Sequence, residues 1–173
     1  CYHDRFSHRK TSTMQATAVT VRVPATSANL GAGFDCLGLA LDMFASITIT
    51  FGEAEQPPTE DVGEKMVLTA IRQTYLRIGK TPPNGLRARY QVSIPLGRGL
   101  GASAVARVAG VVAVNEFERG VMSEGQCLDI ASELEGHGDN ACPALFGGMQ
   151  VCVQAGDGHY LRAACRFPAD AAM

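Results

Sequence analysis

Alternation of apolar and polar residues predicts the strands of this chain. A strand is predicted over 18–23, where Pro24 should end it, and a second over 45–51. The strictest alternation covers 86–94, and it places the apolar residues on one face. Near the C-terminal end, two alternating segments within 149–167 flank a Gly-Asp-Gly turn, which predicts a hairpin.

A 3.6-residue spacing of apolar positions predicts three helices. The first covers 60–78 with Thr59 as its N-cap, and the second, rich in alanine and valine, covers 102–119. The third covers 124–135, where Ser123 opens a capping box. Helices and strands mixed in this order predict an α+β domain.

Composition restricts the class of partner. Apolar residues make up 46% of the 173 residues, charged residues 18%, and the formal net charge is −2. A chain of this length can bury one core without disulfides or metals. The charge balance argues against nucleic-acid binding through a basic surface, so we expect a small-molecule partner.

The cysteines and the apolar runs indicate a protein of the reducing cytoplasm. Six cysteines are scattered without a Cys-x-x-Cys pair or a zinc-ligand spacing. No apolar run approaches the length of a membrane span, and no signal-peptide pattern is present. We therefore expect cytoplasmic localisation without membrane attachment.

The first thirteen residues differ from the rest of the chain. Residues 1–13 are polar and basic, and Met14 follows them. We interpret them as a leader or an expression-derived extension, and 14–173 as the domain.

A glycine-rich segment, "PLGRGLGAS", separates the strand over 86–94 from the helix over 102–119. Its glycines, Gly97, Gly99 and Gly101, fit neither the Walker loop nor the dinucleotide fingerprint. Glycines that lead into a helix N-terminus expose backbone N–H groups to an anion. The alternative is a tight turn without a ligand.

Three motifs together resemble the GHMP kinase family, and in detail its homoserine kinases. They are "VRVPATSANLGAGFDCLGLAL", "IPLGRGLGASAVA" and "ELEGHGDNACPALFGG". The resemblance implies the GHMP-kinase N-terminal domain, an α+β fold with a ribosomal-protein-like two-layer arrangement of sheet and helices. It also implies that the family's C-terminal ferredoxin-like domain is absent from this truncated chain.

The resemblance implies an ATP and magnesium site at the glycine loop. Ser103 and Glu133 would hold Mg²⁺, with Glu135 as the alternative to Glu133. Ala102 stands where the family usually has a first serine. The residues implied to bind ATP are Pro95, Leu96, Gly97, Arg98, Gly99, Leu100, Gly101, Ala102, Ser103, Ala104 and Val105.

The first and third motifs imply the substrate site. Asn29 and Asp35 would hold the amino-acid substrate together with His137 and Asn140. The catalytic residues implied are Asn140 and, as a weak candidate for general base, Asp139; Gly138 replaces the usual proline of this motif. Taken alone, the first pair could form Asx-turns, and the histidine could be a surface residue.

The activity implied is ATP-dependent phosphorylation of the L-homoserine side-chain hydroxyl to O-phospho-L-homoserine, a step of threonine biosynthesis, in an enzyme that could form a homodimer. Two alternatives stay open. One is another GHMP small-molecule kinase of the mevalonate type, and the other is an inactive nucleotide-binding fragment.

Overall fold

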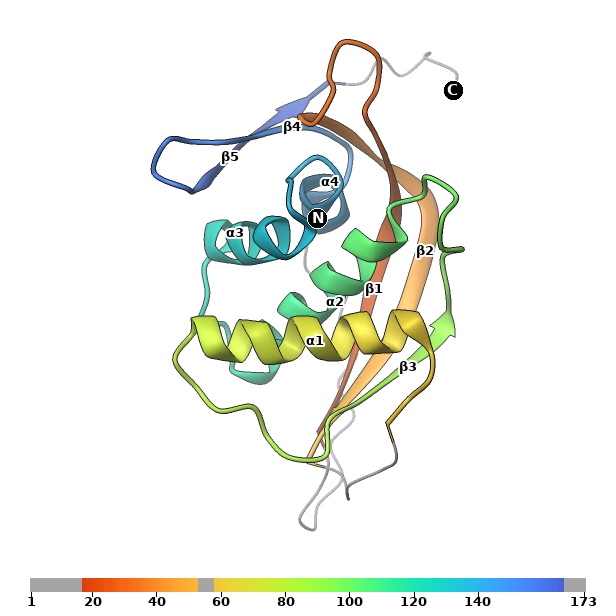
Figure 1. Ribbon diagram of the computed structural model, residues 1–173, viewed down its shortest axis with the longest axis vertical. Coiled ribbons are helices and arrows are strands. Elements are labelled where there is room, and N and C mark those ends of the chain that lie inside the picture. The colour runs from red at the N-terminus through yellow and green to blue at the C-terminus, as the bar shows by residue number, and fades with distance from the viewer. Residues whose placement is uncertain (1–16, 53–57, 167–173) are drawn as a thin grey trace.

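A layer of helices packs on one face of an antiparallel sheet in the computed structural model, which describes residues 17–52 and 58–166 (Figure 1). The interpretation of residues 1–13 as a leader or an extension lies outside the described residues. The mixture of helices and a sheet confirms the predicted α+β class.

The sheet is built around one long central strand, β2. One edge of β2 pairs with β1 over most of its length. The other edge is divided, because β3 pairs with residues 46–50 and β4 with residues 37–39. The strands are β1 (Thr17–Ala28), β2 (Leu37–Phe51), β3 (Arg87–Val92), β4 (Met149–Gln154) and β5 (Tyr160–Cys165), which forms a hairpin with β4.

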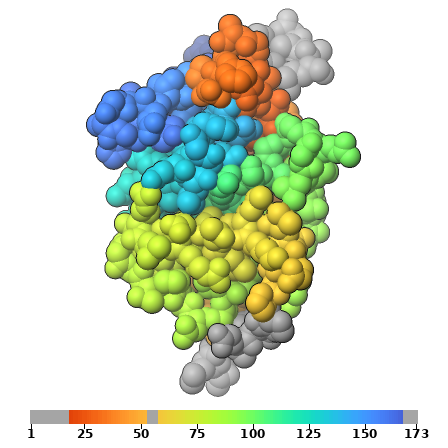
Figure 2. Space-filling view, in the orientation of Figure 1, coloured from red at the N-terminus to blue at the C-terminus, as the bar shows by residue number. Residues whose placement is uncertain are grey.

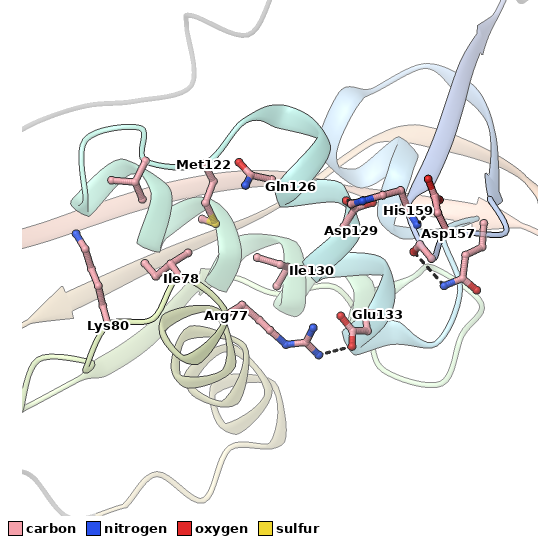
Figure 3. A pocket seen from close by; sticks show the side chains of 13 residues that line it. Arg77, Ile78, Lys80, Met122, Gln126, Asp129, Ile130, Glu133, Asp157 and His159 are labelled. Atoms are coloured by element: carbon pink, nitrogen blue, oxygen red, sulfur yellow. Dashed lines mark hydrogen bonds and ion pairs between the residues drawn. The ribbon is translucent and has the colours of Figure 1, made fainter.

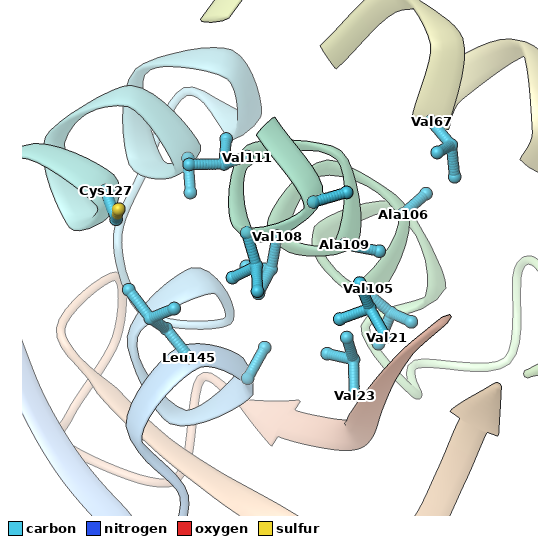
Figure 4. Close-up of a cluster of buried hydrophobic side chains, with 14 of the residues drawn as sticks. Val21, Val23, Val67, Val105, Ala106, Val108, Ala109, Val111, Cys127 and Leu145 are labelled. Atoms are coloured by element: carbon cyan, nitrogen blue, oxygen red, sulfur yellow. The ribbon is translucent and has the colours of Figure 1, made fainter. Parts of the chain in front are cut away.

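Helix α2 lies at the centre of the helical layer, where it contacts β1 and each of the other three helices (Figure 4). Its alanine and valine side chains let β1 and α1 approach from different sides. A Cβ at Gly110 would lie 2.7 Å from Ala70 Cβ, so glycine permits close packing of α1 on α2. The helices are α1 (Val62–Arg77), α2 (Ala102–Phe117), α3 (Glu124–Glu135) and α4 (Ala141–Phe146).

Strand β1 does not end at Pro24, as the sequence predicted, but continues to Ala28. The pairing with β2 shifts register between Pro24 and Thr26, and such a bulge accommodates a residue without a backbone N–H. Strand β2 correspondingly begins at Leu37 rather than at residue 45. The periodicity missed this half of β2 because glycine and half-exposed residues interrupt the alternation.

The helix starts also differ in part from the prediction. Asp61, not Thr59, caps α1, and its side chain accepts the backbone N–H of Glu64 at 2.8 Å. The predicted capping box of α3 is confirmed. Helix α4 was not predicted, because it is one short segment that contains Pro143.

Candidate nucleotide and substrate site

The glycine loop requires its three glycines for conformational reasons. Gly97, Gly99 and Gly101 have φ of 70°, 69° and 63°, a region that residues with a Cβ rarely adopt. Residues 95–99 are exposed, and Gly101 forms the N-cap of α2 without a side-chain cap. The loop therefore presents backbone to solvent at the end of a 16-residue helix.

The N-terminus of α2 is suited to an anion. No acidic residue lies in the first turn of α2, and aligned peptide dipoles place partial positive charge there. Backbone N–H groups of the first turn lack partners within the helix. A phosphate group could accept hydrogen bonds from them at this position.

Ser103, in the first turn of α2, contacts an acidic residue of α3. Its Oγ donates to Glu135 Oε1 at 2.6 Å, and the other carboxylate oxygen of Glu135 forms an ion pair with Arg107. The Glu135 side chain is 9% exposed. Partial burial of the Arg107 guanidinium lowers its pKa. The ion pair with Arg107 compensates the buried negative charge of Glu135.

The structure does not bring Glu133 to Ser103, which differs from the pairing expected from the sequence. Glu133 forms an ion pair with Arg77, at the C-terminal end of α1 (Figure 3). Residues two positions apart on a helix point about 200° apart, so Glu133 and Glu135 face opposite sides of α3. Glu135, the alternative, is the acidic residue in contact with Ser103.

The turn before α4 holds the predicted histidine, aspartate and asparagine together. The Asp139 carboxylate is fully buried, and its Oδ1 accepts the Asn140 backbone N–H at 2.7 Å and contacts Nδ1 of His137. Asn140 Nδ2 also donates to this oxygen at 3.3 Å. The His137 ring remains 41% exposed, so it can reach a ligand while Asp139 orients it.

Asn140 and the glycine loop meet at Thr26, a residue that the sequence analysis missed. Thr26 Oγ1 donates to Asn140 Oδ1 at 2.7 Å, and the Thr26 backbone N–H donates to Leu100 O at 3.1 Å. Its place inside the motif "PATSANLG" was the available signal. Thr26, from the first motif, therefore contacts both the second and the third motif.

Gly138 stands where the family motif usually has proline, and the structure gives a local reason. A Cβ at this position would lie 2.4 Å from Cys152 Sγ and 2.9 Å from Tyr160 Cδ1. Both side chains come from the β4–β5 hairpin, which packs against the turn. Any larger residue at 138 would require these side chains or the hairpin to move.

Asn29 and Asp35 lie in the exposed connection between β1 and β2, drawn in orange at the top of Figure 2. Asn29 Oδ1 accepts the Asp35 backbone N–H at 3.0 Å, and both residues have positive φ. The Asn29 contact closes the loop on itself. The start of β2, which follows this connection directly, adjoins the turn before α4, because a Cβ at Gly38 would lie 1.8 Å from Asp139 O.

A cavity of about 310 Å³ lies directly beside the glycine loop. Its walls come from the start of α1, from β3 with the segment after it, and from the first turns of α2. Burial, together with the charges of Asp61 and Glu64, raises the pKa of Tyr90 to about 12, so its hydroxyl stays a donor at neutral pH. Lining residues include Asp61, Tyr90, Ser93, Ile94, Leu96 and Val105.

The described residues contain no group of three or more His, Cys, Asp or Glu side chains placed to hold a metal ion. Mg²⁺ does not require such a group, because it usually takes one or two protein oxygens together with phosphate oxygens and water. The Ser103 hydroxyl and the Glu135 carboxylate are oxygen donors in contact with each other. They fit this mode of binding.

Within 17–52 and 58–166, the structure has no helix long and apolar enough to cross a membrane. The model of the GHMP kinases N-terminal domain matches residues 65–148. The homoserine kinase of Clostridium botulinum (strain 657 / Type Ba4) is 42% identical over 143 residues, 78% of this chain and 47% of that protein. The homoserine kinase of Nostoc punctiforme is 38% identical over 81% of this chain and 49% of its own length.

The solved structures that resemble this chain include homoserine and mevalonate kinases. Homoserine kinase from Cytophaga hutchinsonii superposes with a TM-score of 0.72 at 27% identity, over 94% of this chain and 56% of that one. Mevalonate kinase from Methanococcus jannaschii, at 14% identity and a TM-score of 0.64, shares the fold. The chain spans about half the length of the curated relatives it matches. Residues 65–148 therefore match a GHMP kinases N-terminal domain, and the chain is similar to the N-terminal portion of homoserine kinases.

Proposed function

We propose that this chain is the nucleotide-binding part of an ATP-dependent kinase that phosphorylates the side-chain hydroxyl of L-homoserine to O-phospho-L-homoserine. One observation carries the proposal: where the glycine loop enters the N-terminus of α2, Thr26 bonds both to the loop and to Asn140. A role in threonine biosynthesis and a cytoplasmic location belong to the same proposal. Its sequence similarity to homoserine kinases supports this substrate.

The triphosphate would lie along residues 95–105. The exposed backbone of the loop and the first N–H groups of α2 would donate to phosphate oxygens. Arg98 is exposed within the loop and can add a positive charge. Phosphoryl transfer depends mainly on position and on neutralisation of charge, which this arrangement supplies.

The nucleoside would occupy the cavity beside the loop. Ile94 and Val105 are buried at this cavity and offer apolar contact to a base. The Asp61 carboxylate, which also lines the cavity, can accept from an exocyclic amino group, and the Tyr90 hydroxyl can donate. This cavity combines apolar walls with polar groups, and small-ligand sites use such polar groups to fix the orientation of the ligand.

Mg²⁺ would be held by Ser103 and Glu135, with the phosphates supplying further oxygens. The cation would neutralise charge on the phosphate oxygens. Glu135 replaces Glu133 in this assignment because Glu135 contacts Ser103 and Glu133 contacts Arg77. Arg107 holds the Glu135 carboxylate in place from the opposite oxygen.

The amino-acid substrate would lie between the β1–β2 connection and the turn before α4. The exposed Asp35 carboxylate can attract the substrate ammonium, with Asn29 shaping the loop around it. Asn140 would position the hydroxyl that attacks the γ-phosphate, and His137 would contact the substrate. Asp139 is fully buried, so we assign it the positioning of these two side chains rather than proton abstraction.

A coupled assay of ADP release tests this function on the 173-residue chain and on any longer product of the same reading frame. Homoserine-dependent turnover by the longer product, with little by this chain, is the expected result. Turnover with mevalonate instead would support the mevalonate-type alternative. Binding of an ATP analogue without turnover of either substrate by either protein would support an inactive nucleotide-binding module.

A further inference from the structure

Thr26 occupies an unusual place for a polar side chain, since it is fully buried in the sheet. It follows the register shift in β1, where the pairing with β2 resumes opposite Ala40. Helices α2 and α4 both contact β1, and Thr26 bonds to Leu100, just before α2, and to Asn140, just before α4. Thr26 therefore faces the two segments that the proposed function assigns to nucleotide and to substrate.

The polar groups of Thr26 are divided between those two segments. Its backbone N–H donates to Leu100 O of the glycine loop at 3.1 Å. Its hydroxyl donates to Asn140 Oδ1 at 2.7 Å, at the start of α4. One residue thus fixes the loop through its backbone and the turn through its side chain.

Gly101 shows how tightly the three segments fit. A Cβ at 101 would lie 1.9 Å from Thr26 Oγ1 and 3.0 Å from Asn140 Oδ1. Only glycine at 101 leaves room for the Thr26 hydroxyl between the glycine loop and Asn140. The Thr26 hydroxyl can therefore bond to Asn140 only because Gly101 has no Cβ.

The hydroxyl also determines which way the Asn140 amide points. Because Oδ1 accepts from Thr26, Nδ2 faces Asp139 Oδ1, to which it donates at 3.3 Å. Without the Thr26 donor, the Asn140 oxygen would lose its partner and the amide could rotate. The orientation of Asn140 thus depends on a side chain that does not reach the substrate.

We propose that Thr26 is a positioning residue that fixes the Asn140 side chain against the phosphate loop, and so sets the acceptor hydroxyl relative to the γ-phosphate. The inference rests on the proposed function for its catalytic meaning. Its structural content, that the Thr26 hydroxyl orients the Asn140 amide, can be measured without nucleotide.

The test compares Thr26→Val, which removes the hydroxyl at similar volume, with Thr26→Ser, which keeps it. Both variants keep the backbone N–H that holds the glycine loop, so binding of a non-hydrolysable ATP analogue with Mg²⁺ should stay within about twofold of that of the unaltered chain. Homoserine-dependent kcat of the longer product of the reading frame should fall about tenfold in Thr26→Val and recover in Thr26→Ser. Thr20→Val is the matched control, because Thr20 lies on the same strand and its hydroxyl pairs with Thr48 at 2.9 Å. It should match the unaltered protein in both measurements.

Exchange of the Asn140 side-chain amide protons, followed by NMR without nucleotide, gives the second readout. Exchange should accelerate in Thr26→Val and recover in Thr26→Ser; if the valine variant does not fold, Thr26→Ala replaces it. Unaltered Asn140 exchange in the folded variant would overturn the inference, whatever the kcat. If the unaltered chain binds no nucleotide, the proposed nucleotide site fails, and the exchange measurement still decides the role of Thr26.

Discussion

Two regions of the molecule treat polar side chains differently. Beside the glycine loop and in the turn before α4, Thr26 and Asp139 are fully buried, and Glu135 is 9% exposed. At the C-terminal end of α1, Arg77 and Glu133 pair while each remains about half exposed (Figure 3). Similar residue types thus form a buried network in one region and a solvated ion pair in the other.

The difference indicates where the chain carries a cost for function. A buried polar group is destabilising unless its hydrogen bonds are satisfied, whereas an exposed ion pair has little effect on stability. Asp139 Oδ2 is buried without a hydrogen-bond partner among the described residues. Beside the glycine loop this cost falls on a residue of the candidate site, whereas Ser132 Oγ on α3 and Gln150 Oε1 on β4 carry it elsewhere.

The largest expected effect is that of Gly101→Ala. The new Cβ would collide with Thr26 Oγ1 in a backbone conformation that already disfavours a side chain, so we expect a loss of about 3 kcal/mol in unfolding free energy. ATP-analogue binding should be lost as well. Denaturant unfolding and calorimetry measure the two effects.

Gly99→Ala is the matched control for Gly101→Ala. Gly99 has a similar φ but no neighbour within 4 Å of an added Cβ. It should cost only about 1 kcal/mol, from backbone strain alone. Equal losses in the two variants would contradict the tight junction of Gly101 with Thr26.

The next effect compares the two glutamates of α3 directly. Glu135→Ala leaves Arg107 largely buried without its partner, and we expect a loss of about 2 kcal/mol in unfolding free energy. Glu133→Ala removes an exposed pair and should cost less than about 0.5 kcal/mol. Magnesium-dependent tightening of ATP-analogue binding should likewise disappear only in Glu135→Ala. The reverse ranking would restore Glu133 as the metal ligand.

Periodicity predicted the elements whose contacts are regular along the chain. Helices α1, α2 and α3 were expected nearly at their observed bounds, because each has an apolar stripe or a capping signal of its own. The need for glycine in the loop was also inferred, and positive φ at Gly97, Gly99 and Gly101 confirms it. These features depend on local sequence.

What the sequence could not provide depends on contacts between distant segments. Thr26 and Asn140 are 114 residues apart, and nothing in either segment alone indicates their hydrogen bond. Glu135 was ranked below Glu133 because the packing of α3 on α2, which selects the inward-facing glutamate, is a tertiary feature. The continuation of β1 beyond Pro24 likewise required the bulge opposite β2.

A smaller effect is expected for Gly138→Ala, in the turn before α4. The added Cβ would overlap Cys152 Sγ, and relief of this overlap should cost about 1–2 kcal/mol of stability. Combining it with Cys152→Ala should recover part of the loss, because the nearest atom is removed. Thermal unfolding measures these losses. Additive losses in the double variant would show that Cys152 is not what excludes a side chain at position 138.

The smallest effect concerns His159, which lies in the same exposed region as Arg77 and Glu133. Its hydrogen bond to Asp129 raises the pKa of His159 above 6.5. The pairing therefore stabilises the fold fully below about pH 6.5, and the stabilisation is lost as pH rises through the raised folded pKa. Tm measured from pH 5.5 to 8.5 should show this decline in the unaltered chain and not in His159→Gln. An identical profile in both would exclude the pairing as its source.

The most direct test of the central claim is a calorimetric titration of this chain with a non-hydrolysable ATP analogue and Mg²⁺, repeated with Gly99→Val. The account predicts one-to-one binding to the unaltered chain and none to Gly99→Val, with circular dichroism showing that both remain folded. Equal binding to both proteins, or no binding to the unaltered chain, would contradict the claim that the glycine loop holds the triphosphate.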